Sequence, residues 1–191
     1  KTNSNSEEKA QKKLDEIDIE FQNSSSMVSA KTIFSKSGWG WSNNNVSMEI
    51  NYTVKVPIGN TVDLNNDYGG IYLDEINGVA NISCDYGRLE LGKLNADNNV
   101  LTFDYTSKST VEYMKSGKIS ADYSSFEIEK AGNLVISADY TTSEVNNAKN
   151  VKYSCDYGSI KINNTANIEG VGDYLTTRFG VVHGNVDITS D

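Results

Sequence analysis

The chain has 191 residues, and its 26 acidic residues against 17 basic ones give a formal net charge of −9. So acidic a chain is a poor partner for nucleic acid or for an anionic membrane. One histidine and two cysteines argue against a multi-histidine metal site, a zinc site or a His-based catalytic triad. No apolar run approaches the roughly 18 residues of a membrane-spanning helix. Abundant Asn, Ser, Thr, Val, Ile and Tyr favour strands and turns.

Residues 1–13 are polar and charged, and we expect a flexible lead-in or one short helical turn there, with Ser4 and Glu7 at capping-box spacing. Residues 14–56 are expected to form longer strands that open or cap the repeats that follow. Apolar residues alternate over 14–21, 27–34 and 46–56, which predicts three strands. Such a cap would protect the exposed first edge of a repeat array.

Two tryptophans, Trp39 and Trp41, stand in a stretch of Gly, Ser and Asn within this segment. Side chains this large are rarely left in solvent without a reason. Capping of the apolar end of the repeats is the favoured interpretation, and stacking on a carbohydrate is the alternative. The pair are therefore the candidate ligand-binding residues of the chain.

The sequence from residue 57 onward is dominated by an internal repeat, in which the dipeptide Asp-Tyr recurs every 17 to 19 residues. The aspartates are Asp67, Asp85, Asp104, Asp122, Asp139, Asp156 and Asp173. The tyrosines that follow them are Tyr68, Tyr86, Tyr105, Tyr123, Tyr140, Tyr157 and Tyr174. A residue at the same place in each row belongs to one column, and these two columns are the candidate structural ladders.

Other columns repeat as well, and they indicate the fold. Three residues before each Asp, six of seven rows hold a large apolar residue: Leu64, Ile82, Leu101, Ile119, Ile136 and Tyr153, with Gly170 in the last row. Each row therefore holds two short strands, and stacking the rows in register would bury their apolar faces. We predict an all-β, parallel β-solenoid over 57–191, with neighbouring rungs about 4.8 Å apart. An antiparallel meander gives similar periods, but it does not explain the same residue type at the same corner.

The two ends of the repeat carry their own predictions. Val62 and Leu64 fall in the apolar columns, so the first rung is expected there, after Pro57, where no ladder N–H is needed. Asp191 stands where an eighth Asp-Tyr would begin, which predicts further rungs in the natural protein. An open last rung would favour end-to-end self-association.

The Asp column needs compensation, because neighbouring carboxylates one rung apart repel by roughly 0.9 kcal/mol in water. We favour carboxylates that accept backbone N–H groups from the turn after the Tyr. A row of Ca²⁺ sites is the alternative, although the calcium-solenoid pattern Gly-Gly-x-Gly-x-Asp is absent. The Tyr column is expected to stack at the edge of the core, and an exposed, glycan-binding stripe is the alternative.

Cys84 and Cys155 share one column, four rungs apart. That separation of about 19 Å is far beyond the reach of a disulfide, so we predict two free, buried thiols. His183 has no partner of catalytic type nearby in the sequence and is expected at the surface.

The runs NYTVKVP at 51–57, VDLNNDYGG at 62–70 and CDYG at 84–87 resemble an adhesin-type family of bacterial β-strand-repeat proteins, a Bacteroidetes-type domain of unknown function. The resemblance covers residues 14–191. It implies a right-handed, single-stranded parallel β-helix and export across the inner membrane of a Gram-negative host. It also implies no enzyme activity, no metal and no cofactor.

Three functions follow from these observations. The favoured one is a non-catalytic exported β-solenoid, periplasmic, outer-membrane-associated or extracellular, which binds a surface glycan or protein or serves as an envelope scaffold, without membrane insertion by this segment. The alternative is an envelope sensor or signalling module. A polysaccharide-active enzyme is less favoured, because it needs carboxylates or a base and a cation gathered at one place. Here the carboxylates are spread along a column, and the only arginines, Arg88 and Arg178, lie about five rungs apart.

Overall fold

The computed structural model describes residues 1–35 and 46–190. The chain divides into two compact units, Lys1–Lys55 and Val56–Asp191. This boundary lies within one residue of the start predicted for the repeats. Trp39 and Trp41 lie outside the described residues.

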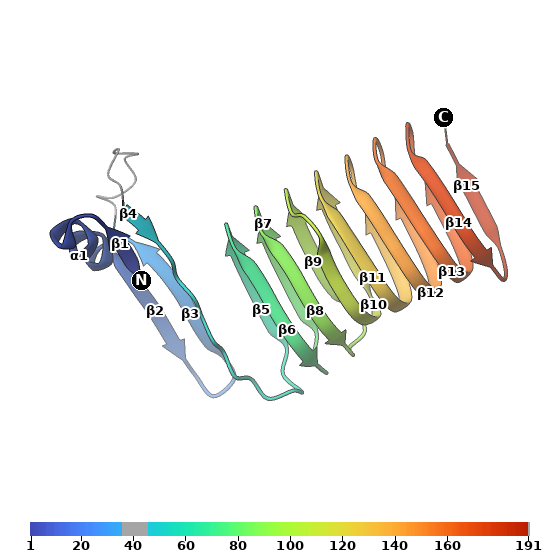
Figure 1. Ribbon diagram of the computed structural model, residues 1–191. Coiled ribbons are helices and arrows are strands. Elements are labelled where there is room, and N and C mark those ends of the chain that lie inside the picture. Colours follow the sequence, from blue (N-terminus) through green and yellow to red (C-terminus); the bar gives the residue numbers. More distant parts are fainter. Residues whose placement is uncertain (36–45, 191) are drawn as a thin grey trace. The chain divides into compact units, whose positions relative to one another are not determined.

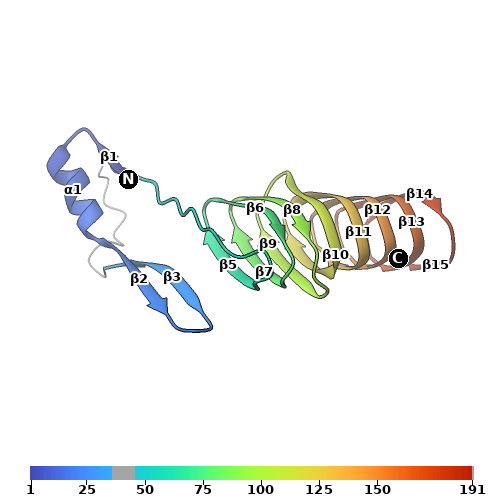
Figure 2. The ribbon, with the colours of Figure 1, turned by 90° about the horizontal axis from the view of Figure 1, so that it is seen from below.

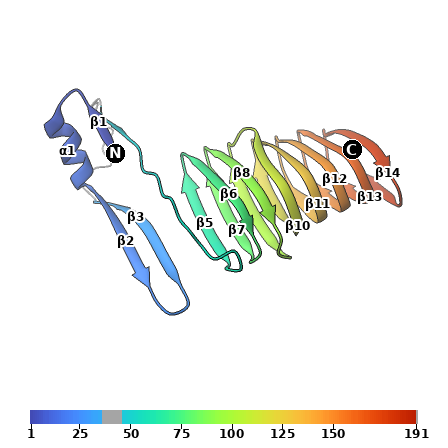
Figure 3. The ribbon, with the colours of Figure 1, turned by 60° about the horizontal axis from the view of Figure 1, so that its bottom comes forward.

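Over its described residues, 1–35 and 46–55, the first unit holds one helix and two small antiparallel sheets. Helix α1 (Glu7–Asp15) is followed by the hairpin of β2 (Ile17–Asn23) and β3 (Val28–Phe34), which Figure 3 shows. Strand β1 (Thr2–Ser4) pairs with β4 (Val46–Met48). No helix of the described chain has the length and apolar character needed to cross a bilayer.

The expectation of a flexible lead-in or a single helical turn is corrected, because α1 has nine residues. Its N-cap is Ser6, whose hydroxyl accepts the backbone N–H of Lys9, rather than Ser4. Acidic residues occupy its first turn and basic residues its last, an arrangement that suits the helix dipole. The capping-box spacing of Ser4 and Glu7 therefore placed the start of the helix two residues too early.

The strand predicted over 46–56 is also wrong in most of its length. Only Val46–Met48 forms a strand. It ends opposite Thr2, the first residue of its three-residue antiparallel partner β1. Tyr52 and Val54 are 46% and 66% exposed. An alternating sequence forms a strand only where a neighbour supplies the ladder hydrogen bonds. The capping role expected for residues 14–56 stays a prediction.

The second unit consists, over its described residues, of strands joined by parallel pairing into one 11-stranded sheet that coils on itself. The strands that open it are β5 (Val62–Asp67), β6 (Gly70–Ile76), β7 (Ala80–Asp85), β8 (Arg88–Leu94) and β9 (Asn99–Asp104). Longer strands follow: β10 (Ser109–Asp122), β11 (Ser125–Ser137), β12 (Thr142–Ser154) and β13 (Ser159–Val171). The last two are β14 (Thr176–Val182) and β15 (Val186–Thr189).

The rungs lie side by side along one axis, as Figure 1 shows. One layer holds β5, β7, β9, the second halves of β10 to β13, and β15. The other holds β6, β8, the first halves of β10 to β13, and β14. Turned by 90°, the unit shows both layers of the coil (Figure 2). The predicted β-solenoid is confirmed, and the parallel pairing excludes the antiparallel meander.

The core lies between the two layers and consists of apolar columns stacked along the axis. In the column predicted from the sequence, Ile82, Leu101, Ile119 and Ile136 are each at most 2% exposed. Tyr153 continues this column, and the next rung has Gly170 beside it, where an added Cβ would lie 2.1 Å from the Tyr153 ring. Cys84 and Cys155 are free and buried, as predicted.

The unequal row lengths of 17 to 19 residues arise at the corners. In the 17-residue rows, strands such as β11 run straight through the second corner. The 19-residue row has four residues, 95–98, between β8 and β9 instead. The 18-residue row that ends at Asp122 has its extra residue at the other corner, where Lys108 has a positive φ of 55°. The columns therefore stay in register despite the insertions.

Candidate functional site

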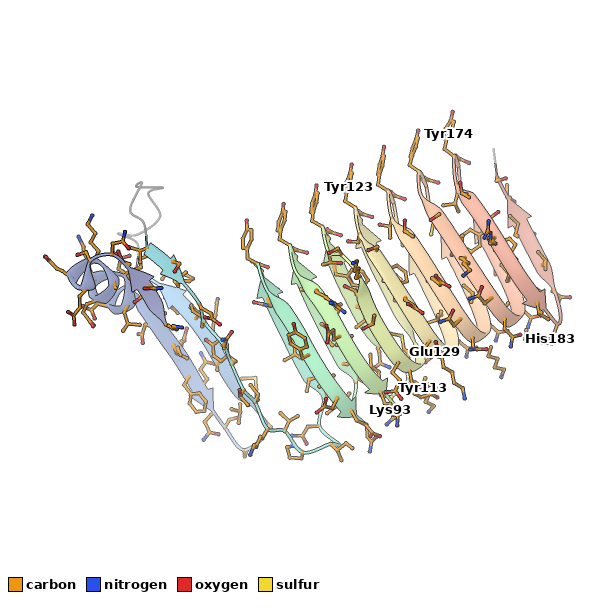
Figure 4. The ribbon with its side chains drawn as sticks, viewed as in Figure 1. Lys93, Tyr113, Tyr123, Glu129, Tyr174 and His183 are labelled. Atoms are coloured by element: carbon orange, nitrogen blue, oxygen red, sulfur yellow. The ribbon has the colours of Figure 1, made fainter. Side chains whose placement is uncertain are left out.

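The most distinctive surface feature of the solenoid is the Tyr ladder, formed by Tyr68, Tyr86, Tyr105, Tyr123, Tyr140, Tyr157 and Tyr174. Neighbouring ring centroids lie 4.8 to 5.2 Å apart, and neighbouring ring planes differ by at most 11°. The rings thus form one continuous stack, as the sequence predicts. Figure 4 shows Tyr123 and Tyr174 projecting from one edge of the solenoid, with Lys93, Tyr113 and His183 at the opposite edge.

The ladder is held outward by its backbone conformation. All seven residues have positive φ, between 50° and 62°. This left-handed conformation suits Gly or Asn and costs other residues roughly 1–2 kcal/mol. The next residue in each row turns back into the core, so the column after the Tyr contains buried Thr106, Ser124 and Thr141. The corner therefore places each aromatic ring at the outer edge and, in these three rows, a small polar residue inside.

The Asp column satisfies the backbone of this corner, but not in the way predicted. A carboxylate oxygen of each of five aspartates accepts the backbone N–H of the Asp in the next rung, at 2.8 to 3.2 Å. The N–H of six of the seven Tyr in turn donates to the carbonyl of the next rung's Asp, as Tyr123 does to Asp139 at 3.0 Å. The carboxylates are thus bound along the axis, between rungs, and not within their own turn. These hydrogen bonds offset the repulsion between neighbouring charges.

The expectation that the Tyr column forms the edge of the core is wrong. The five internal rings are 49–52% exposed, and the two end rings, Tyr68 and Tyr174, are 77% and 74% exposed. The left-handed backbone breaks the alternation of the strand, so the ring that alternation would direct inward points outward instead. The exposed stripe that sequence reasoning kept as the alternative is the arrangement observed.

The surroundings of two ladder rings favour their protonated hydroxyls. Desolvation raises the pKa of Tyr86 and of Tyr123, and the adjacent Tyr and Asp side chains raise it further. Among the described residues, no protein group donates to or accepts from the phenol oxygens of the ladder. The phenol hydroxyls of the ladder can therefore both donate and accept hydrogen bonds with a ligand.

A polar row accompanies the ladder on the neighbouring layer. Two residues before each Asp, the column consists mainly of small hydroxyl residues with outward side chains: Ser83, Thr102, Ser120, Ser137 and Ser154. Four of these five are exposed. In each row the Asp stands between this hydroxyl residue and the Tyr, so the Asp column separates the hydroxyl row from the Tyr ladder.

The opposite corner carries residues that sequence reasoning missed. Asn150 donates from Nδ2 to Oδ1 of Asn133 at 2.7 Å, and Asn167 donates in the same way to Asn150 at 2.7 Å. Asn163 repeats the contact to Asn146 at 2.7 Å. Their common spacing of 17 residues was the signal that could have found them. His183 lies at this edge and is exposed, as predicted, with Nε2 3.1 Å from Oδ1 of Asn164.

Metal binding has little support in the described residues, which contain no group of three or more His, Cys, Asp or Glu side chains placed to hold an ion. Along the Asp column, each carboxylate from Asp85 to Asp156 accepts a backbone N–H with one of its oxygens. The hydrogen-bonding interpretation of the column thus has direct support. The burial of Cys155 raises the pKa of its thiol to about 12, which is unsuited to metal binding or nucleophilic chemistry.

Comparison with known proteins found no matching family model, no matching curated protein and no matching solved structure. The resemblance to an adhesin-type family stays a prediction drawn from the residues. Function must therefore be argued from the Tyr ladder and its surroundings.

Proposed function

We propose that this chain is a non-catalytic, exported β-solenoid of the adhesin type, which binds an extended ligand on a cell surface along its Tyr ladder. The observation that carries the proposal is the ladder itself: seven aromatic side chains, half or more exposed, repeated once per rung on one edge. Such a repeat offers many equivalent weak contacts, and a ligand with its own repeat can use them together.

The cost of the arrangement supports a binding role. Stacking of the rings contributes roughly 0.5–1.5 kcal/mol for each pair, which does little more than offset the left-handed backbone. Asn would occupy this conformation with less strain. Residues held in costly conformations concentrate at functional sites, and here seven occur in one line.

A thermal-shift series on the full chain tests this proposal, with a panel of cell-surface glycans and extracellular proteins. A ligand at 100 times its Kd should stabilise the protein by about 2.7 kcal/mol. The variant Tyr105→Asn/Tyr123→Asn/Tyr140→Asn removes three rings while keeping side chains that accept positive φ. Tyr72→Asn, an exposed Tyr outside the ladder, is the matched control. Loss of the shift in the triple variant alone supports the proposal, and a flat response across the whole panel contradicts it.

A further inference from the structure

The chemistry that the Tyr ladder offers is decided by which parts of its rings are free. Each internal ring has another ring about 5 Å away on both of its faces, as Tyr123 has Tyr105 at 5.2 Å and Tyr140 at 4.8 Å. A sugar or a flat aromatic ligand therefore has no ring face to stack on in the middle of the ladder. The ring edges and the hydroxyls remain, so recognition along the ladder must rest on hydrogen bonds.

The hydroxyl is the part of the ladder that the fold does not require. Phe would stack as well as Tyr, and the chain uses Phe at other positions, such as Phe103 and Phe126 in the core. All seven positions of the ladder nevertheless hold Tyr. The phenol oxygens have no protein partner among the described residues, so their hydrogen-bonding capacity is available to a ligand.

The period of the row selects among extended ligands. Seven hydroxyls at intervals near 5 Å span about 29 Å along the axis. An extended peptide presents groups on one side every two residues, or about 6.8 Å, and loses register within a few rungs. An extended β-1,4-linked pyranose chain advances by nearly one rung for each sugar, and its hydroxyls both donate and accept. Successive sugars of such a straight chain face opposite ways, so a polysaccharide of this type can place a hydroxyl at every rung and repeats the same contact at every second rung.

The negative charge of the solenoid further limits which class of extended polymer can bind. Residues 67–191 hold 18 acidic residues against 10 basic ones, and seven of the acids form the Asp column beside the ladder. This field repels nucleic acids and acidic polysaccharides. It also disfavours a second copy of the solenoid, although that copy would match the period. An uncharged polymer avoids both the repulsion of an acidic polymer and the repulsion of a second solenoid.

We infer that the Tyr ladder binds a neutral, extended β-1,4-linked polysaccharide, which lies along the solenoid axis with its hydroxyls on the row of phenol oxygens. The inference rests on the proposed binding function and adds the ligand class and the atoms that recognise it. The hydroxyl row formed by Ser83, Thr102, Ser120, Ser137 and Ser154 lies beyond the Asp column and offers further neutral groups there.

Isothermal titration calorimetry of the full chain with cellohexaose provides the direct test. Maltohexaose has the same sugars in a coiled α-1,4 chain, and cellobiose has the same linkage over two rungs only. We expect cellohexaose to bind at least about tenfold more tightly than either, because only a long, straight chain contacts several rungs together. Affinity electrophoresis in hydroxyethylcellulose and in carboxymethylcellulose tests the charge argument, and retardation should occur in the uncharged polymer alone.

The variant Tyr105→Phe/Tyr123→Phe/Tyr140→Phe isolates the hydroxyls, since it keeps the stacked rings and the fold. We expect its affinity for cellohexaose to fall about tenfold or more. The matched control is Tyr72→Phe/Tyr113→Phe, which removes two hydroxyls outside the ladder and should bind as the parent does. Circular dichroism and the melting temperature confirm that both variants are folded.

Three results would overturn the inference: no binding of cellohexaose at millimolar concentration, equal binding of maltohexaose, or undiminished binding by the triple Phe variant. The thermal-shift panel separates this failure from failure of the proposed function. If a ligand of the panel shifts the melting temperature of the parent and the Tyr105→Asn/Tyr123→Asn/Tyr140→Asn variant loses that shift, the proposed function stands and only the ligand class is wrong. If the panel is flat, or if the shift is lost only in Trp39→Ala/Trp41→Ala, the proposed function fails as well.

Discussion

The two edges of the solenoid link neighbouring rungs through different hydrogen-bonding groups. At one edge, Asn133, Asn150 and Asn167 use their amides on one another, donor to acceptor, from rung to rung. At the other edge the Asp carboxylates bind the backbone between rungs, and the Tyr rings stack outside them. At the first edge the Asn amides hydrogen-bond to one another and hold neighbouring rungs together. The second edge has, at each rung with a ladder Tyr, a phenol hydroxyl without a partner among the residues that the structure describes.

This difference indicates where a repeat protein keeps its function. An edge whose hydrogen bonds are all internal has little to offer a ligand, however regular it is. The Tyr edge is equally regular, is strained in its backbone, and retains free donors and acceptors. The binding surface is therefore expected at the Tyr edge and the stabilising contacts at the Asn edge.

Both edges pack on one apolar core, so a destabilising substitution in the core should unfold both edges together. An Ala in place of Gly170 would put its Cβ 2.1 Å from the Tyr153 ring, which has no room to move. We expect Gly170→Ala to lower the free energy of unfolding by about 3 kcal/mol. Urea denaturation at constant m-value measures the loss.

The control for this prediction is Gly59→Ala, because an added Cβ there meets nothing within 4 Å. It should change stability by no more than about 0.5 kcal/mol. The double change Tyr153→Ile/Gly170→Ile restores the apolar pattern of the column and should recover most of the loss. An unrescued double variant would show that Tyr153 is not the cause.

The Tyr edge should respond to a substitution according to backbone conformation as well as ring loss. Tyr123→Val removes two stacking contacts and places a β-branched residue at a φ of 50°, so we expect a loss of about 2.5 kcal/mol. Tyr123→Asn loses the same contacts but suits the conformation, and its loss should be nearer 1 kcal/mol. Equal losses in thermal or urea unfolding would contradict a strained edge.

The Asn edge should respond to the loss of one amide. Asn150 donates to Asn133 and accepts from Asn167, so Asn150→Ala breaks two contacts and leaves two partners unpaired. We expect a loss of about 1.5 kcal/mol. Asn81→Ala, on an exposed strand position outside the amide ladder, should cost less than about 0.5 kcal/mol. Similar losses for both variants would mean that the ladder adds nothing.

The smallest expected effect concerns pH. The pKa of the Cys155 thiol rises from 9.0 to about 12 because burial desolvates the thiolate. Above pH 9 the unfolded chain releases this proton and the folded chain keeps it, so stability falls as pH rises through this window. Between pH 8 and 10 the parent should lose about 1 kcal/mol more than Cys155→Ala. Ala occupies the same column at Ala121 and Ala138, so the variant fits, and parallel pH profiles would refute the assignment.

Much of the solenoid could be predicted from the sequence, because a repeat places each column in every rung at once. The register, the apolar core, the first rung at Val62 and the two separate thiols all followed from spacing. The conformation of the Tyr corner did not, since Tyr has no preference for positive φ and only the surrounding hydrogen bonds impose it. Alternation likewise misled over 46–56, where no neighbouring strand completes the pattern.

The hydrogen bonds of the Asn ladder and of the Asp column share one direction along the axis. Each Asn amide of the ladder donates toward the preceding rung, as Asn150 does to Asn133, and each Asp carboxylate accepts from the following one, as Asp122 does from Asp139. Bonds that all point one way polarise one another and add up along the axis. Along these two columns the donors face the preceding rung and the acceptors the following one, whereas hydroxyl–backbone bonds such as Thr106 N–H to Ser124 Oγ run the other way. A further rung can join either end in one orientation only, so the fold can lengthen without ever reversing.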